Sequence, residues 1–381
     1  MSFAKVFAPL AVVSLCLLAE FTSLGEKASS AKTPEIEDIE FLGQVTLATG
    51  TQFQETEVGG LSGITYDPRK NVYYSISDDR SEKSPARFYT LKIELSRNVL
   101  AVEVVDVTTL LNSDKQPFAA LSLDPEGIAL TRNGRLFISS EGDVNRLVEP
   151  FVNQFLLNGR QVLELPVPDK FLPTTKERGI RNNLAFESLT ITPNQKYLFT
   201  ATENALYQDG NEATVDAGSP ARILQYNLQT GQPEQEFLYI TEPVAAAPKP
   251  AGSFSTNGLV ELLAIDKNRF LSLERSFSTG VGNTIKLFEV SVAKADDISD
   301  IESLTSANID KIKPAQKKLL LDFEKLNIPL DNIEGLTFGP CLPNGRRVLI
   351  AVSDNNFSPI QFTQVLAFGV KSEPNLCWQQ R

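Results

Sequence analysis

The chain has 381 residues, of which 42% are hydrophobic, and it carries a formal net charge of -11 at pH 7. Its Lys and Arg residues form no cluster dense enough to neutralise a phosphate backbone, so we do not expect nucleic acid as a partner. The sequence contains no histidine. This excludes Ser-His-Asp and Cys-His catalysis and the usual histidine-bearing zinc and iron sites.

The start of the chain has the layout of a secretory signal peptide. Lys5 precedes an apolar run over residues 6–19, and small residues follow from Gly25 onward. The run is shorter than the roughly 20 residues that a membrane-spanning helix needs, and an uncleaved membrane anchor is the alternative. We therefore expect residues 1–31 to be a signal peptide. Residues 32–381 would form one secreted or periplasmic domain, monomeric and without a membrane span.

Five copies of a strand-turn-strand pattern follow the predicted signal peptide. Each copy has a short apolar strand, a turn containing Gly, Asn or Pro, and a second apolar strand that ends near an acid. The copies are LSGITYDPRKNVYYSISDD from Leu61, PEGIALTRNGRLFISSEGD from Pro125, FESLTITPNQKYLFTATEN from Phe186, VELLAIDKNRFLSLERS from Val260 and IEGLTFGPCLPNGRRVLIAVSDN from Ile333. A repeat of about 60 to 75 residues is too regular for chance and too long for a helical solenoid unit.

Each repeat supplies four short strands, because further β-rich runs follow each strand pair. Four-stranded antiparallel units repeated around an axis are the blades of a β-propeller. The last copy has only three strands, and IEFLGQVTLAT, before the first copy, would supply the fourth and close the ring. The predicted fold class is therefore all-β, a propeller of five blades by motif count, with six as the alternative. Cys341 and Cys377 are an even pair in an oxidising compartment, which predicts a disulfide that holds the tail to the last blade.

The repeated acids should meet on one face of this propeller. In an antiparallel meander, the start of strand one, the end of strand two and the start of strand three share one edge of the sheet. The second positions of the five copies are Ser62, Glu126, Glu187, Glu261 and Glu334. The acids that end strand two are Asp78, Glu141, Glu203, Glu274 and Asp354. We expect the first set around the central channel and the second in a wider ring.

Arginines are expected on the same face. Ser-Pro-Ala-Arg opens strand three in the first and third blades, ending at Arg87 and Arg222, and Arg275 follows Glu274. Two carboxylates about 6 Å apart repel by roughly 3 kcal/mol at an effective dielectric of ~20, so packed acids need a cation, an arginine or a bound proton. Calcium suits an all-oxygen site outside the cytoplasm. Alternatively, each glutamate accepts backbone N–H bonds from a neighbouring blade, and each Ser-Pro-Ala-Arg is turn chemistry with a local salt bridge.

Several of these segments resemble a known family. GGLSGITYD with YYSISDDR, DPEGIAL with FISSEGD, AFESLTIT with TATEN, and NIEGLTFGP with LIAVSDNN are similar to the phytase-like domain described as "esterase-like activity of phytase", found in secreted bacterial, often cyanobacterial, proteins. The resemblance extends from about Phe41 to Val370. It implies a propeller whose acidic face binds calcium and a phosphorylated substrate. The fourth copy departs from the pattern with Glu-Leu-Leu in place of Glu-Gly, and the first has serine in place of glutamate.

The leading hypothesis is a metal-dependent phosphoric ester hydrolase acting on a small phosphorylated or ester substrate. In this hypothesis Glu126, Glu187, Glu261 and Glu334 hold calcium. Arg87, Arg222, Arg275 and Ser62 bind the substrate, and Glu141 or Asp78 is the general base. One alternative is a non-catalytic secreted propeller that binds a ligand or a protein. The other is a calcium-dependent lactonase or aryl esterase.

Overall fold

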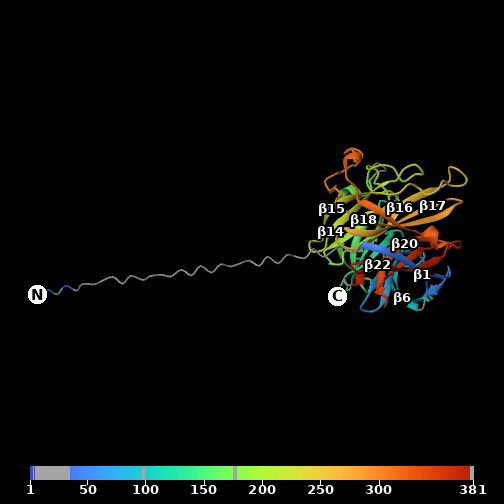
Figure 1. The fold of residues 1–381 in the computed structure, drawn as a ribbon, viewed down its shortest axis with the longest axis horizontal. Helices are drawn as coiled ribbons and strands as arrows, with labels where there is room; N and C mark the ends of the chain where they lie inside the picture. Colours follow the sequence, from blue (N-terminus) through green and yellow to red (C-terminus); the bar gives the residue numbers. More distant parts are fainter. Residues whose placement is uncertain (3, 5–34, 97–98, 175–177, 378–381) are drawn as a thin grey trace. The chain divides into compact units, whose positions relative to one another are not determined.

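The computed structural model describes residues 1–2, 4, 35–96, 99–174 and 178–377. The chain divides into two units, Met1–Lys32 and Thr33–Arg381. The predicted signal peptide, apart from three residues at its start, lies outside the described residues. Every strand belongs to the second unit (Figure 1). Among the described residues, no helix is both long and apolar enough to cross a membrane.

The second unit is a five-bladed β-propeller, as the repeat predicts. Five sheets each hold four antiparallel strands, and the first strands of successive blades contact one another around a ring. From the inner strand outward, the first three blades are β4 (Leu61–Asp67), β5 (Val72–Ser77), β6 (Arg87–Ser96) and β7 (Val99–Thr109); β8 (Pro125–Leu130), β9 (Arg135–Ser140), β10 (Phe151–Leu156) and β11 (Gln161–Leu165); and β12 (Phe186–Ile191), β13 (Tyr197–Thr202), β14 (Pro220–Asn227) and β15 (Gln232–Ile240). The last two are β16 (Ser255–Ala264), β17 (Arg269–Ser278), β18 (Gly282–Ser291) and β19 (Gln316–Asp322); and β20 (Asn332–Cys341), β21 (Arg347–Asp354), β22 (Thr363–Glu373) and β1 (Glu35–Leu47).

A few short elements complete the described chain. The small hairpin of β2 (Gln52–Phe53) and β3 (Thr56–Glu57) precedes the first blade. Three 3-10 turns lie in connections between strands, at Asp169–Phe171, Ile309–Lys311 and Phe323–Leu326.

The turns between the two inner strands explain why these segments fold as hairpins. In the second blade, the Thr131 hydroxyl accepts the backbone N–H of Arg135 at 2.9 Å, and Gly134 adopts a φ of 78° that suits glycine. Thr192 makes the equivalent bond in the third blade, to the N–H of Tyr197 at 3.1 Å. The same side-chain device therefore sets the strand register in two repeats.

The hydrophobic core is divided among the interfaces between blades. Five clusters of buried apolar side chains each join two neighbouring blades, and each blade contributes to two of them. Between the third and fourth blades, for example, Phe199 of β13 contacts Phe270 of β17 with ring centroids 4.7 Å apart. No blade can bury both of its apolar faces alone, so stability depends on a closed ring.

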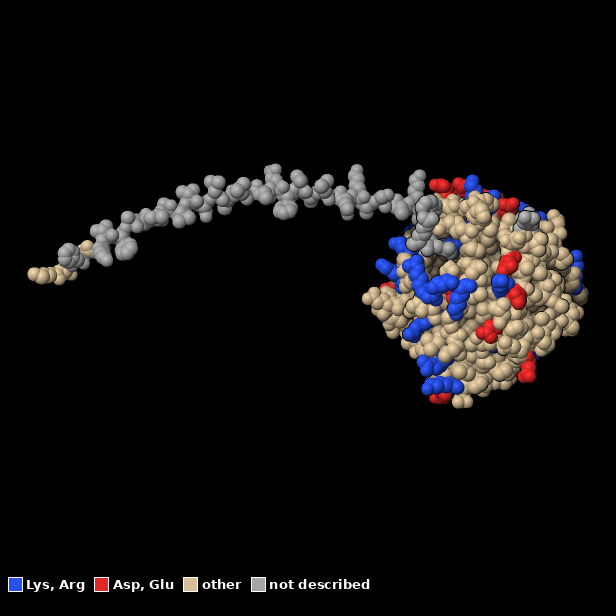
Figure 2. Space-filling model, turned by 90° about the horizontal axis from the view of Figure 1, so that it is seen from below, with Lys and Arg blue, Asp and Glu red and all other residues tan. Residues whose placement is uncertain are grey.

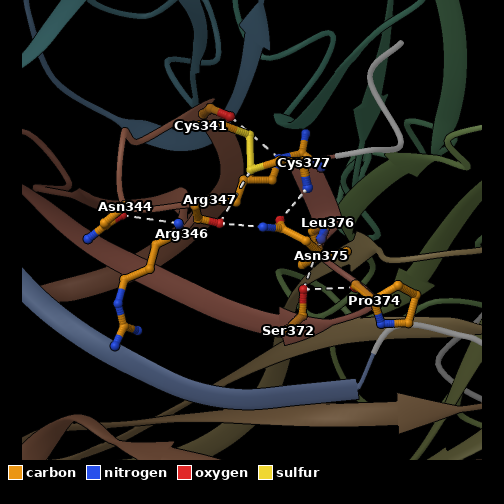
Figure 3. The surroundings of a disulfide bond; sticks show 11 residues. Cys341, Asn344, Arg346, Arg347, Ser372, Pro374, Asn375, Leu376 and Cys377 are labelled. Atoms are coloured by element: carbon orange, nitrogen blue, oxygen red, sulfur yellow. Dashed lines mark hydrogen bonds between the residues drawn. A yellow bond between two sulfur atoms is a disulfide. The ribbon is translucent and has the colours of Figure 1, made fainter.

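The N-terminal strand closes that ring. β1 pairs antiparallel with β22 from Glu35↔Glu373 to Leu47↔Thr363, which makes it the outer strand of the fifth blade. A disulfide joins Cys341, at the end of β20, to Cys377, just beyond β22, with Cα atoms 5.9 Å apart. Figure 3 shows Asn375 beside this bridge, donating a side-chain hydrogen bond to the carbonyl of Gly345 at 2.8 Å. The C-terminal segment is thus fixed to its own blade.

Charged side chains are unevenly distributed on the surface. On the face in Figure 2, Lys and Arg side chains gather toward one side, Asp and Glu are scattered, and most of the area is uncharged. A larger group of acids lies inside the molecule: of the carboxylates named in the sequence analysis, Glu126, Glu141, Glu187, Glu203 and Glu334 are all buried.

Candidate functional site

A cavity of about 640 Å³ opens at the end of the ring where the inner strands begin. Carboxylates from four of the five blades line it, together with two arginines and a group of apolar side chains. The lining acids are Asp78, Asp124, Glu126, Glu187, Asp331, Glu334 and Asp354. We call this space the central cavity. Glu141 and Glu203 lie among these acids, since each shares a carboxylate cluster with Glu126 or Glu187.

A bulge near the start of each inner strand positions these acids. In the third blade Phe186 pairs with Thr202 and Ser188 with Ala201, so Glu187 is an extra residue without a partner. Ser62 and Glu334 occupy the same extra position in their blades, and in the second blade Glu126 and Gly127 together face one residue. An extra residue turns the side chain out of the regular alternation of the strand. The bulge is therefore what directs each glutamate into the cavity.

The fourth blade carries the same bulge one residue earlier than the sequence comparison predicts. Leu259 pairs with Glu274 and Glu261 with Leu273, which makes Val260 the extra residue. Val260 is thus the equivalent of Glu126, and the predicted equivalence of Glu261 is wrong. The shift also moves the second strand: Arg275, and not Glu274, occupies the position of Asp78 and Glu141.

Glu261 has a different set of neighbours. It is 3% exposed, does not line the cavity, and accepts the backbone N–H groups of Leu262 at 2.9 Å, Leu189 at 3.2 Å and Leu336 at 3.5 Å. These donors belong to β16, β12 and β20, so one carboxyl group links three blades. Burial raises its pKa well above the usual value, while the three N–H bonds oppose that shift. The blade-to-blade alternative weighed above describes Glu261.

Two overlapping carboxylate clusters lie at the wall of the cavity, within reach of a single ion each. Asp124, Glu126 and Glu141 form the first, and Glu141, Glu187 and Glu203 the second; within each, one oxygen per residue lies within 4.8 Å of the others. Glu141 belongs to both. One of its oxygens accepts the N–H of Ala185, whereas Oε2 is buried and has no hydrogen-bond partner among the described residues.

This donor set fits a hard divalent cation. All ligands are carboxylate oxygens, as Ca²⁺ and Mg²⁺ prefer, and no sulfur or nitrogen donor is available to favour a softer metal. A second buried oxygen without a hydrogen-bond partner in the described structure, Oδ1, belongs to Asp78, which lines the same cavity. Glycine makes room for one ligand: a Cβ on Gly258 would lie 2.2 Å from Oε1 of Glu203. The site thus requires close approach of the backbone to a carboxylate.

Burial raises the pKa of most acids around the cavity. Burial raises the pKa of Asp78 to about 8, and repulsion from Asp124 and Glu334 adds to the shift. Burial also raises the pKa of Asp124 to about 6 and that of Glu203 to about 7, although Arg80 and Arg275 respectively oppose these shifts. For Glu126, Glu141 and Glu187, burial followed by neighbouring carboxylates raises the pKa well above the usual value. A cation bound by the two clusters would displace protons from its own ligands, and Asp78 belongs to neither cluster.

Two arginines supply positive charge at the cavity. Arg275 has a side chain 12% exposed, with Nη2 at 2.9 Å from Oε1 of Glu334 and 3.5 Å from Oε1 of Glu203. Arg80 pairs with Asp124 and donates to Oδ1 of Asn183 at 2.7 Å. Among the described residues, Nη1 of neither arginine makes a hydrogen bond. Each guanidinium can therefore hold a carboxylate and still donate to an anion in the cavity.

A model of the family described as "Phytase-like: Esterase-like activity of phytase" matches residues 56–357. The chain belongs to this phytase-like family. The matched segment begins at β3 and ends just after β21, and so contains the inner strands of all five blades. It includes every carboxylate of the two clusters.

More distant similarities extend to one curated protein and to solved structures. An "Uncharacterized secreted protein" of Arthroderma benhamiae is 22% identical over 222 residues, which cover 50% of this chain and 42% of that protein. The chain described here therefore spans less than half the length of this relative. Among solved structures, the periplasmic gluconolactonase PpgL of Pseudomonas aeruginosa is similar at 12% identity, with 83% of this chain and 89% of that chain covered and a TM-score of 0.35. The Dos1 propeller is similar at 8% identity, 81% and 67% coverage and a TM-score of 0.35.

Three residues expected to bind substrate do not line the central cavity. Arg87 is buried and donates to Oδ2 of Asp79 at 2.7 Å, and Arg222 is buried with Nε at 2.6 Å from Oδ2 of Asp209. The repeated Ser-Pro-Ala-Arg thus supplies an internal anchor for the loop after the second strand. Ser62 is buried too, and its hydroxyl donates to the backbone oxygen of Glu126 at 2.9 Å.

Two cavity residues, Asp124 and Arg80, were not among the candidates. Asp124 immediately precedes the inner strand β8, and Arg80 follows the acids that end β5. Only their position in the sequence could have indicated them, because each stands next to a repeat motif, at the sheet edge where the motif acids meet. Because neither recurs in the other copies, a comparison of repeats could not identify them.

Proposed function

We propose that the chain is a secreted, calcium-dependent phosphoric ester hydrolase whose central cavity is the active site. The observation that carries the proposal is the pair of carboxylate clusters sharing Glu141, beside two arginines with free N–H donors. Membership of the phytase-like family supports the reaction class, and the relative described as secreted supports an extracytoplasmic location.

In this proposal calcium is held by Asp124, Glu126, Glu141, Glu187 and Glu203. A bound calcium ion supplies charge neutralisation, polarisation of a phosphoryl oxygen and a lower pKa for a bound water. Glu141, expected above as a general base, is assigned as a ligand common to both clusters. Glu334 is assigned to hold Arg275, since its carboxylate is already paired with that guanidinium at 2.9 Å.

Three residues of the chain bind the substrate and transfer the proton. Arg80 and Arg275 bind and orient the phosphoryl oxygens through their free N–H groups, and charge developing on those oxygens strengthens the bonds. Asp78, with a pKa of about 8, carries a proton at neutral pH. It is therefore better suited to protonate the leaving alcohol oxygen than to remove a proton from water, which reverses the base role expected from the sequence.

The test is phosphate release from p-nitrophenyl phosphate and from phytate, with calcium and with a chelator. We expect turnover that requires calcium and falls at least about 100-fold in Glu126→Gln. Glu94→Gln is the matched control, because Glu94 is an exposed glutamate on β6 whose only ion pair is with Lys92, among the described residues. Turnover unaffected by chelation, or no turnover of either substrate, would refute the proposal. Lactone hydrolysis without phosphatase activity would point to a lactonase instead.

A further inference from the structure

One wall of the central cavity is apolar and exposed. Phe254, Phe277, Leu330, Ile360 and Phe362 line it. Phe254 stands just before β16, at the end of the connection from the third blade, and the other four belong to the fourth and fifth blades or the connection between them. Phe254 is 66% exposed and Ile360 is 90% exposed. The rings of Phe254 and Phe277 lie 6.1 Å apart between centroids. Large apolar side chains left in water at the edge of a charged cavity mark a surface that contacts something apolar.

This apolar wall is joined directly to the charged centre. Phe277 stands two residues after Arg275 on β17, and alternate residues of a strand point to the same face. Arg275 in turn contacts Glu334 and Glu203. A ligand whose anionic group reaches Arg275 would therefore place its next atoms against Phe277 and Phe254.

The cavity has few positive charges for a highly charged ligand. Arg80 and Arg275 are the only basic residues among its described lining residues, and both are already paired with carboxylates. A polyphosphorylated sugar carries several phosphates that each need cationic partners. The two free guanidinium edges match one phosphoryl group.

We propose that the cavity takes phosphate monoesters of apolar alcohols, aromatic or branched, whose alcohol part packs against Phe254, Phe277 and Ile360. The inference rests on the proposed hydrolase function and adds the substrate class. In the reaction, water adds its oxygen to phosphorus, the bond from phosphorus to the ester oxygen breaks, and the alcohol leaves with a proton while inorganic phosphate remains. No other co-reactant is needed.

Equilibrium binding tests the inference without turnover. The probes are phenylphosphonate, methylphosphonate and phytate, measured by calorimetry on the mature chain with calcium, since the phosphonates cannot be hydrolysed at their P–C bond. We expect phenylphosphonate to bind about 10-fold or more tighter than methylphosphonate, because burying much of a phenyl ring changes Kd by this order. Phe254→Ser and Ile360→Ser should reduce this ratio toward one while the Kd of methylphosphonate stays constant.

The control is Leu319→Ser, which removes a 45% exposed leucine from β19, in the fourth blade but outside the cavity. It should leave the ratio unchanged. Equal affinities for the two phosphonates, or tighter binding of phytate than of phenylphosphonate, would overturn the apolar substrate class and leave the hydrolase proposal standing. Binding of none of the three probes would overturn both.

Discussion

Replacing Glu261 by methionine should destabilise the propeller without affecting calcium binding. Methionine keeps the length of the side chain but cannot accept hydrogen bonds from the N–H groups of Leu262 and Leu189, now at 2.9 and 3.2 Å. Each buried N–H left unpaired costs roughly 1–3 kcal/mol, and removal of a buried carboxyl group offsets part of this. We expect a loss of about 2–4 kcal/mol. At an unfolding entropy of ~2.1 cal/mol/K per residue, Tm falls by roughly 3–6 °C for a domain of this length.

The matched variant is Glu126→Met, at the bulge position that faces the cavity. In the described structure the Glu126 carboxylate accepts no hydrogen bond, and a second ionised carboxylate within 4.8 Å would repel its charged form by about 3.5 kcal/mol at an effective dielectric of ~20. Without calcium, its Tm should therefore be unchanged or higher than that of the parent, and the rise in Tm on adding calcium should shrink. Thermal melts with calcium and with chelator measure both. If Glu261→Met loses the calcium response and Glu126→Met keeps it, the assignment of positions in the fourth blade is wrong.

Four further outcomes are expected. Carboxyl groups with folded pKa values of about 6, 7 and 8 bind more protons in the folded than in the unfolded chain. In chelator, the free energy of unfolding should therefore fall from about pH 4 to pH 8, by up to ~1.4 kcal/mol per pH unit for each proton. Calcium should make this fall smaller. A Tm that rises over this pH range in chelator would contradict the prediction. Arg222→Met should lower stability by about 3–5 kcal/mol, with no change in phosphonate Kd, because Asp209 loses its buried cationic partner and Glu236 keeps only Lys170. Arg275→Met should instead weaken phosphonate binding about 10-fold or more; equal Kd values would remove it from the site. Reducing the Cys341–Cys377 bridge, which spans 36 residues, should cost roughly 4 kcal/mol by denaturant titration, and an unchanged midpoint would show that the bridge adds no stability.

The fold could be predicted from the sequence because each repeat has the same local pattern of strands and turns. Inner strands, turns and the missing fourth strand of the last copy are all visible in the residues, and β1 pairs where the count requires. Register inside a repeat is less visible. In the fourth copy, Val-Glu-Leu-Leu can be aligned with its glutamate on either side of the bulge, since apolar residues stand at both places. Only the pairing of Leu259 with Glu274 decides between them.

The convergence of three repeated glutamates on one cavity could be predicted for the same reason. Glu126, Glu187 and Glu334 line the cavity because their copies share both the bulge and the glutamate. Arg87 and Arg222 recur in the sequence, but the recurrence reflects a buried aspartate that each one holds. Sequence repetition cannot separate a residue repeated for folding from one repeated for chemistry. Burial and partners separate them.

The pairing of β1 with β22 also has a consequence for how the chain reaches its folded state. β1 is the first strand of the described structure and β22 is the last, so the fifth blade cannot form until β22 has been synthesised. Until then β1 is an unpaired strand, the kind of edge at which chains aggregate. Its first half is EIEDIE, with four acids in six residues. Repulsion between these acids would keep unfinished chains apart, and Lys371 and Arg346 pair with them once the blade closes.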